Sequence, residues 1–152
     1  MPRDNRMSRL LHVLIHMDRH VKRSTSEQIA KMLGTNAVVV RRMMAGLRDM
    51  QLVRSGKGHG GGWELAVPLA AISLRDVYEA IGRPPLFNIG PQAEFSPCLV
   101  EQAVDARITA TLDAAERQVL EQFAQVTVED LAQEFEAKNG VWVPAASGGC
   151  ES

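Results

Sequence analysis

Two neighbouring stretches decide the fold: residues 24–49 read STSEQIAKMLGTNAVVVRRMMAGLRD, and residues 52–65 read LVRSGKGHGGGWEL. Ser24 or Thr25 begins a short helix that ends at Gly34, and a second helix starts almost at once, at Thr35 or Asn36. A short apolar strand, a glycine-rich loop with one lysine, and a second strand follow. This order predicts a mainly α-helical winged helix-turn-helix fold, with a basic helix beside a basic loop.

Composition and charge narrow the class of protein. The chain has 152 residues, of which 45% are hydrophobic, which is enough for one compact core. Residues 1–60 hold twelve Lys and Arg and four Asp and Glu, a net charge of +8, whereas residues 61–152 carry a net charge of −9. The basic half suggests a polyanionic partner, and the acidic half is better suited to assembly or sensing.

Hydrophobic periodicity predicts further helices around this unit. Ser8 is placed to cap a helix that runs to about His20 with apolar side chains at helical spacing, and Ser73 is placed to cap a short helix over residues 74–81. A loop rich in Gly and Pro follows. We therefore expect a DNA-binding domain over 1–81, a linker or sensing loop over 82–97, dimerisation helices over 98–137 and a flexible tail over 138–152.

The longest predicted helix runs from Pro97 to about Val126 and carries a single apolar stripe. The apolar residues of this stripe recur at steps of three or four: Val100, Val104, Ile108, Leu112, Ala115, Val119, Phe123 and Val126. So small a domain cannot bury the whole stripe, so we expect a homodimer in which a second copy covers it. Thr127 is placed to cap one further short helix.

The second helix of the pair is the predicted recognition helix. Val40, Met43, Met44 and Leu47 are its expected inward residues, which leaves five for base edges: Asn36, Val38, Val39, Arg41 and Arg42. Asparagine can pair with adenine, arginine can pair with guanine or hold a phosphate, and valine can touch a thymine methyl group. An ordinary helical hairpin with a solvated basic face is the alternative, and the complete helix-turn-helix-wing order argues against it.

The glycine-rich loop is the predicted wing. Arg54, Lys57 and His59 lie among glycines that let the backbone approach phosphates, and a single cation at the tip can enter a minor groove. A flexible hairpin with incidental charge is the alternative interpretation.

Three segments together resemble the Rrf-two family of bacterial winged-helix transcriptional regulators: residues 36–47, residues 52–65 and residues 72–81, which read ISLRDVYEAI. That family includes repressors of iron–sulfur assembly, nitric-oxide response and cysteine metabolism. The resemblance covers about residues 7–135 and implies a homodimer with crossed long helices, bound to two inverted half-sites. By position, the resemblance implies that Lys57 is the minor-groove residue of the wing. It implies that the major-groove residues are Asn36, Val38, Val39, Arg41 and Arg42.

One departure from the family concerns its cofactor. Cluster-binding members carry three closely spaced cysteines between the short helix and the long one, and this chain has only Cys98 there. We therefore expect no iron–sulfur cluster, since a cluster needs mostly thiolate ligands. With Ser96 as cap and Pro97 first in the long helix, Cys98 would lie in the first turn, where a thiolate is favoured. Cys98 is thus either a redox-sensing thiol or a small packing residue.

His12, His16 and His20 recur every four residues on the first helix. Two imidazoles at this spacing can share a metal, but a polar, solvent-facing row is the simpler interpretation. We find no phosphate-binding loop, nucleophile elbow or paired catalytic carboxylates, so the sequence does not predict an enzyme.

The expected function is that of a cytoplasmic, sequence-specific regulator, more a repressor than an activator, which binds an inverted-repeat operator as a homodimer. No signal peptide or membrane span is visible, and the two cysteines, Cys98 and Cys150, form no disulfide framework. Two alternatives remain: a metal- or cluster-sensing regulator of the same fold, and a protein-interaction module that does not bind DNA. An acidic or apolar recognition helix would indicate the interaction module.

Overall fold

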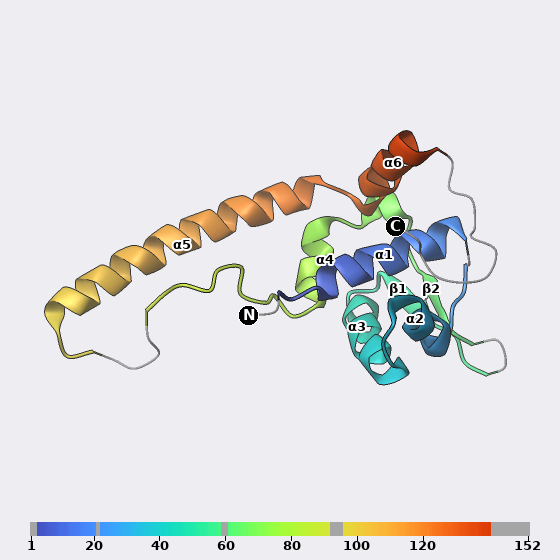
Figure 1. Ribbon diagram of the computed structural model, residues 1–152, viewed down its shortest axis with the longest axis horizontal. Coiled ribbons are helices and arrows are strands. Elements are labelled where there is room, and N and C mark those ends of the chain that lie inside the picture. The colour runs from blue at the N-terminus through green and yellow to red at the C-terminus, as the bar shows by residue number, and fades with distance from the viewer. Residues whose placement is uncertain (1–2, 21, 59–60, 92–95, 141–152) are drawn as a thin grey trace.

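The structure is a computed structural model that describes residues 3–20, 22–58, 61–91 and 96–140 (Figure 1). Its elements, in chain order, are α1 (Arg6–Arg19), α2 (Ser26–Leu33), α3 (Ala37–Asp49), β1 (Val53–Ser55), β2 (Trp63–Leu65), the 3-10 helix η1 (Leu69–Ala71), α4 (Leu74–Ala80), α5 (Leu99–Gln125) and α6 (Val128–Asn139). The predicted fold class, mainly helical with a two-stranded wing, is confirmed. His59, Cys150 and the tail beyond residue 140 lie outside the described residues.

Local capping explains where the helix-turn-helix begins and turns. The backbone N–H of Gln28 donates to Thr25 Oγ1 over 3.1 Å, and the N–H of Thr25 donates to Gln28 Oε1 over 2.8 Å, which is a complete capping box for α2. Gly34 ends α2 with φ of 63°, a left-handed conformation that favours glycine. Asn36 then caps α3, because its Oδ1 accepts a 3.1 Å hydrogen bond from the N–H of Val39.

The wing is an antiparallel hairpin tied to the start of α2. Arg54 lies opposite Glu64 in the β1–β2 register. Trp63 and Ser24 exchange two backbone hydrogen bonds of 2.8 and 3.0 Å, and the buried indole Nε1 of Trp63 donates to Ser26 Oγ over 2.9 Å. A Cβ at Gly62 would lie 2.8 Å from the carbonyl oxygen of Ser24, so only glycine allows this close approach. These contacts fix the wing relative to the helix pair.

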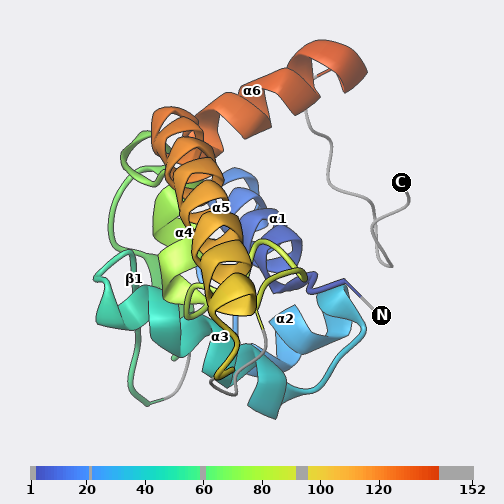
Figure 2. The same cartoon turned by 90° about the vertical axis from the view of Figure 1, so that its left-hand side faces the viewer.

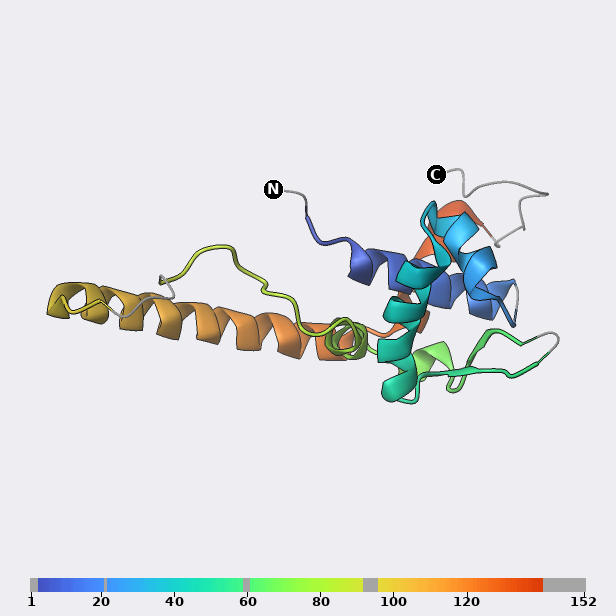
Figure 3. The ribbon, with the colours of Figure 1, turned by 90° about the horizontal axis from the view of Figure 1, so that it is seen from below.

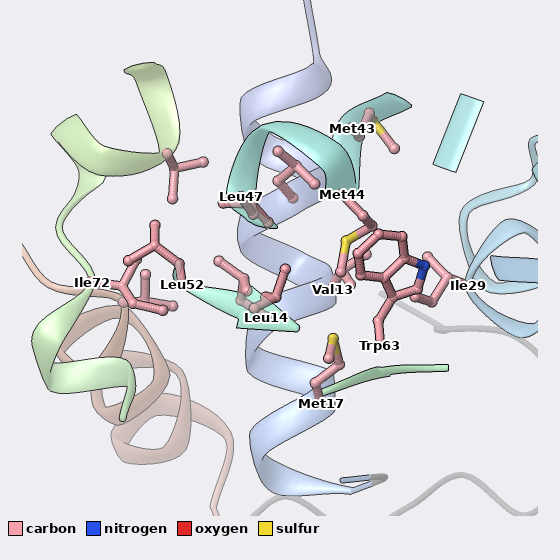
Figure 4. Packing of buried hydrophobic residues seen from close by; sticks show 14 of the residues in the cluster. Val13, Leu14, Met17, Ile29, Met43, Met44, Leu47, Leu52, Trp63 and Ile72 are labelled. Atoms are coloured by element: carbon pink, nitrogen blue, oxygen red, sulfur yellow. The ribbon is translucent and has the colours of Figure 1, made fainter. Parts of the chain in front are cut away.

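One hydrophobic core holds the helices and the wing together (Figure 4). Leu14 from α1 lies at its centre, with Met44 and Leu47 from α3 and Trp63 from the wing packed around the same cluster. All four residues expected to face inward from the recognition helix are buried: Val40, Met43, Met44 and Leu47. The periodicity of the sequence therefore predicted the buried face of α3 correctly.

Helix α5 extends away from this body as a long arm (Figures 1 and 3). Figure 2, a view turned by 90°, shows the other helices gathered behind its far end. Leu120 is its only buried residue. Its last turns are anchored: the rings of Phe123 and Tyr78 lie 6.2 Å apart, and the N–H of Leu74 donates to Val126 O over 2.9 Å.

Helix α6 folds back onto α1 and joins the core of the body. Val128 and Ala132 belong to the same buried cluster as Leu14. Arg19 of α1 donates to Glu129 and Glu136 of α6, each over 2.8 Å. The single core is therefore built from both ends of the described chain, and only α5 leaves it.

Candidate nucleic-acid interface

The outward face of α3 presents the predicted base-reading residues unequally. Val38 is 55% exposed, and Arg41 and Arg42 are also exposed. Val39 is half-buried and packs against the hydrophobic core, and Asn36 uses its Oδ1 to cap the helix. The side chains that α3 offers without a prior partner in the cap are therefore Val38, Arg41 and Arg42, while Asn36 is exposed but uses one lone pair of its Oδ1 for the cap.

A recess of about 300 Å³ brings α3 and the wing together. It is lined by the start of α2, by Arg41 and by the wing: Thr25, Ser26, Glu27, Arg41, Ser55, Gly56, Gly58, Gly61, Gly62 and Trp63. The recognition helix and the wing therefore border one concave surface, which is the arrangement expected of a winged helix that reads a duplex.

Three arginines, one lining this recess and two on the adjoining wing and its approach, are paired with carboxylates. Arg41 Nη2 lies 2.9 Å from Glu27 Oε1, across the turn between α2 and α3. Arg54 Nε and Arg23 Nη2 lie 2.7 and 3.0 Å from the two oxygens of Glu64. The hydrogen bonds from Arg23 and Arg54 hold the pKa of the Glu64 carboxyl below its usual value.

Arg23 was not among the predicted site residues. It precedes the cap of α2 by two positions, and a basic residue there is a visible signal in the sequence. Its partner could not be found in the same way, because Glu64 is 41 residues away in sequence. The structure thus adds Arg23 to the basic surface beside the predicted Arg54.

Two of the predicted cationic side chains, unlike the paired arginines, have no carboxylate partner among the described residues. Arg42 and Lys57 are exposed, and neither takes part in a salt bridge with the residues that the structure describes. Exposed cations without a carboxylate partner are the ones most ready to meet phosphate. His59, the third predicted wing residue, lies outside the described residues.

The start of α5 corrects one prediction. Cys98 is the N-cap of α5 and not a residue of its first turn, because the helix begins at Leu99. The hydroxyl of Ser96 does not cap α5: it accepts a 3.2 Å hydrogen bond from the N–H of Cys98 and itself donates to Glu101. Cys98 is exposed, which is not the position of a packing residue within this chain.

The histidine row of α1 lies partly inside the molecule, whereas a solvent-facing row was the simpler prediction. The ring centroids of His12 and His16 are 4.5 Å apart, and those of His16 and His20 are 5.3 Å apart. Burial, with a smaller effect of the two neighbouring imidazoles, lowers the pKa of His16 to about 4. Among residues 3–20, 22–58, 61–91 and 96–140, no three histidine, cysteine or acidic side chains are grouped to hold a metal ion.

No helix in the described part of the chain is long and apolar enough to span a membrane.

Comparison with known proteins agrees with this geometry. The family model Rrf2 (Rrf-two), described as "Iron-dependent Transcriptional regulator", matches residues 3–134. The HTH-type transcriptional regulator YwnA of Bacillus subtilis (strain 168), named as putative, is 28% identical over 130 residues, which are 84% of this chain and 95% of YwnA.

Solved structures give the same fold. The crystal structure of a transcriptional regulator from Lactobacillus plantarum, also named as putative, superimposes with a TM-score of 0.71 at 25% identity, covering 90% of this chain and 93% of that one. The structure of T. potens IscR has a TM-score of 0.60 at 16% identity, covering 97% of this chain and 94% of that one, and shows the fold alone. Because the family model matches most of the sequence, the chain belongs to the Rrf2 family of transcriptional regulators.

Proposed function

We propose that the protein regulates transcription by binding an inverted-repeat operator as a homodimer, with α3 in the major groove and the wing in the adjacent minor groove. The observation that carries this proposal is the shared recess of α2, Arg41 and the wing. A recognition helix with exposed Val38, Arg41 and Arg42 offers both base-reading and phosphate-binding groups. The basic character of this face also argues against a winged helix that only binds proteins.

The exposed apolar side chains at the start of α5 are the basis for the proposed dimer. Leu99, Val100 and Val104 are 78%, 73% and 50% exposed. Together with Ala103, Arg107 and Ile108 they line an apolar groove of about 560 Å³. A second copy of α5 is the partner that suits a long helix with one apolar stripe, and it would set two recognition helices at a fixed spacing.

Repression would follow from occupancy of the operator, and a signal would act by changing how the α5 pair holds the two reading surfaces. The family description names iron, but the described donors do not fit an iron site. Cys98 is the only cysteine among them, and no three histidine, cysteine or acidic side chains of the described residues are grouped to hold a metal ion. We therefore propose regulation without an iron–sulfur cluster, in the cytoplasm where the duplex is found.

Cys98 is the proposed input for a redox signal. Its thiol is exposed at the start of α5 and is followed directly by Leu99 of the apolar groove. A peroxide would oxidise the thiol to a sulfenic acid with release of water, and a small disulfide would exchange with it to give a mixed disulfide with release of one thiol. Either product would add a polar group at the edge of the proposed dimer contact, and thiols would reverse it. A Cys98→Ser protein should then hold its DNA under a disulfide stress that releases the parent protein, whereas equal release would leave Cys98 without this role.

Salt-dependent DNA binding tests the main proposal. Duplex recovered from a random-sequence pool should show an inverted repeat, and log Kd should change with log salt by about 0.9 for each phosphate contacted. Arg42→Ala and Lys57→Ala should each lower affinity and reduce this slope by about 1.

Arg117→Ala is the matched control, because it removes one exposed cation from α5, away from the proposed interface. It should leave both affinity and slope unchanged. Binding that is flat from about 50 to 200 mM salt would contradict the proposal, and so would an Arg117→Ala effect equal to that of Arg42→Ala.

A further inference from the structure

We infer that Glu27 is a positioning residue that sets DNA specificity by holding Arg41. The inference rests on the proposed function and adds one statement to it. On the surface formed by α3 and the wing, the carboxylate of Glu27 restrains Arg41 but not the adjacent Arg42. Neither the periodicity nor the charge of the sequence assigns this role to Glu27.

The pair is built by the capped ends of two helices. Glu27 lies in the first turn of α2, which the Thr25 capping box fixes, and Arg41 lies on α3, which Asn36 caps. Glu27 Oε1 and Arg41 Nη2 are 2.9 Å apart, and both residues line the recess between α3 and the wing. The side chains are 67% and 55% exposed, so a duplex seated on this face meets both of them.

Adjacent Arg42 provides an internal comparison. It is equally part of the exposed N-terminal half of α3, but no salt bridge holds it within the described residues. The chain therefore presents one restrained guanidinium and one unrestrained guanidinium at successive positions. Reading a base requires a fixed, planar pair of donors, whereas holding a phosphate requires only a nearby charge.

Glu27 affects both the orientation of the Arg41 guanidinium and the charge that Arg41 presents to a phosphate. It occupies part of the guanidinium edge and leaves the remaining N–H groups oriented, which lowers the entropy lost when Arg41 meets a guanine. Its negative charge also repels phosphates, so Arg41 contributes less to binding that does not depend on sequence. Glu27 therefore raises the ratio of specific to non-specific affinity without contacting a base itself.

Glu27→Gln tests this inference, with Asp49→Asn as the matched control. Asp49 pairs with Arg48 at the other end of α3, at 3.5 Å, so both variants remove one carboxylate from an exposed pair on the helix-turn-helix. The probes are a labelled duplex of mixed sequence and the duplex that the wild-type protein selects from a random pool. Thermal unfolding checks that each variant is folded.

Glu27→Gln should tighten binding to the mixed-sequence duplex by about two- to fivefold, the range for an exposed pair. The salt slope on that duplex should steepen by about 0.9, because Arg41 becomes free to neutralise one phosphate. The preference for the selected duplex over the mixed one should fall. All three changes should disappear when Glu27→Gln is made in an Arg41→Ala protein.

Three results would overturn the inference. The first is a Glu27→Gln effect no larger than that of Asp49→Asn, which would indicate net charge alone. The second is an effect that persists in the Arg41→Ala protein, and the third is an unchanged preference for the selected duplex. If the wild-type protein shows no salt-dependent binding to either duplex, the proposed function itself fails, and this outcome is distinct from the other three.

Discussion

The body and the arm of this molecule use the same kind of apolar pattern differently. In α1, Leu10, Val13 and Leu14 are fully buried by other elements of the same chain. In α5, Val100 and Val104 recur at a comparable spacing but are 73% and 50% exposed. An amphipathic helix therefore shows that a face must be covered, but not whether the cover comes from the same chain.

The arm itself is divided in the same way. Towards its end, Leu120 is buried and Phe123 lies against Tyr78 of α4. Towards its start, Leu99 and Ile108 line an open groove. One stripe thus anchors α5 to the body at one end and leaves an apolar surface for a proposed second copy at the other. Four predictions follow from this difference, in order of decreasing expected effect.

The largest effect is expected from charges placed on the free part of the arm. Val104→Asp together with Ile108→Asp would bury two carboxylates in the proposed dimer contact and weaken association by about 3–5 kcal/mol. Sedimentation should show monomers, while the circular dichroism of the body stays the same because neither residue belongs to its core. A dimer of unchanged affinity would show that this groove is not the contact.

The next effect concerns the body. Leu14→Ala would open a cavity at a fully buried site and lower the free energy of unfolding by about 2–5 kcal/mol in urea titrations. Val104→Ala is the matched truncation in the arm and, at concentrations where the protein is monomeric, should change stability by less than about 0.5 kcal/mol. Equal losses for the two variants would contradict the contrast between body and arm.

A smaller effect depends on pH and on the histidine row of α1. Burial lowers the pKa of His16 to about 4, whereas an unfolded imidazole titrates near 6.5. Above pH 6.5 both states are neutral; between pH 6.5 and 4 the unfolded chain binds a proton that the folded chain does not, so stability falls. Because His16 is only half-buried, we expect a loss of about 1–2 kcal/mol over this range.

His16→Leu should remove most of this loss when unfolding is measured at pH 7 and at successive steps down to pH 4. The control is His12→Gln, since burial also lowers the pKa of His12 but to a smaller degree. His12→Gln should therefore leave most of the dependence. A His16→Leu protein with the parent's pH profile would assign the dependence to other groups.

The smallest effect is expected at the joint between arm and body. Thr127→Ala removes the capping box of α6, in which Thr127 Oγ1 accepts from the N–H of Asp130 over 3.1 Å, and should cost about 1 kcal/mol. Asn or Asp at the same position should restore most of it, because both are good caps. Full stability of Thr127→Ala in urea titrations would mean that core contacts alone hold α6.

Much of the fold was predictable because its signals are local. Thr25, Asn36, Ser73 and Thr127 were each expected at or near the start of a helix, and each accepts a hydrogen bond as its N-cap. A cap and the N–H groups that it satisfies lie within a few residues, so the sequence contains both partners. Two helix starts were predicted wrongly. Helix α1 begins at Arg6 after Asn5, so Ser8 lies inside it, and α5 has Cys98 as its N-cap without a side-chain cap bond.

The candidate site was predictable in part. The exposure of Arg41, Arg42 and Lys57 follows from helical periodicity and from a glycine-rich loop, and it agrees with the structure. The partial burial of Val39 did not follow, because it depends on how closely α3 packs on the core.

By itself, then, the sequence determined where most helices begin, which face of α3 is buried and which cations lie outside, since these depend on spacing and on neighbours along the chain. Only the tertiary structure decided that Glu27 holds Arg41, that Glu64 joins Arg23 to Arg54, and that α6 returns to α1 while α5 does not. These contacts join residues 14 to 117 positions apart. Their partners are chosen by packing in space, which the spacing of one segment does not encode.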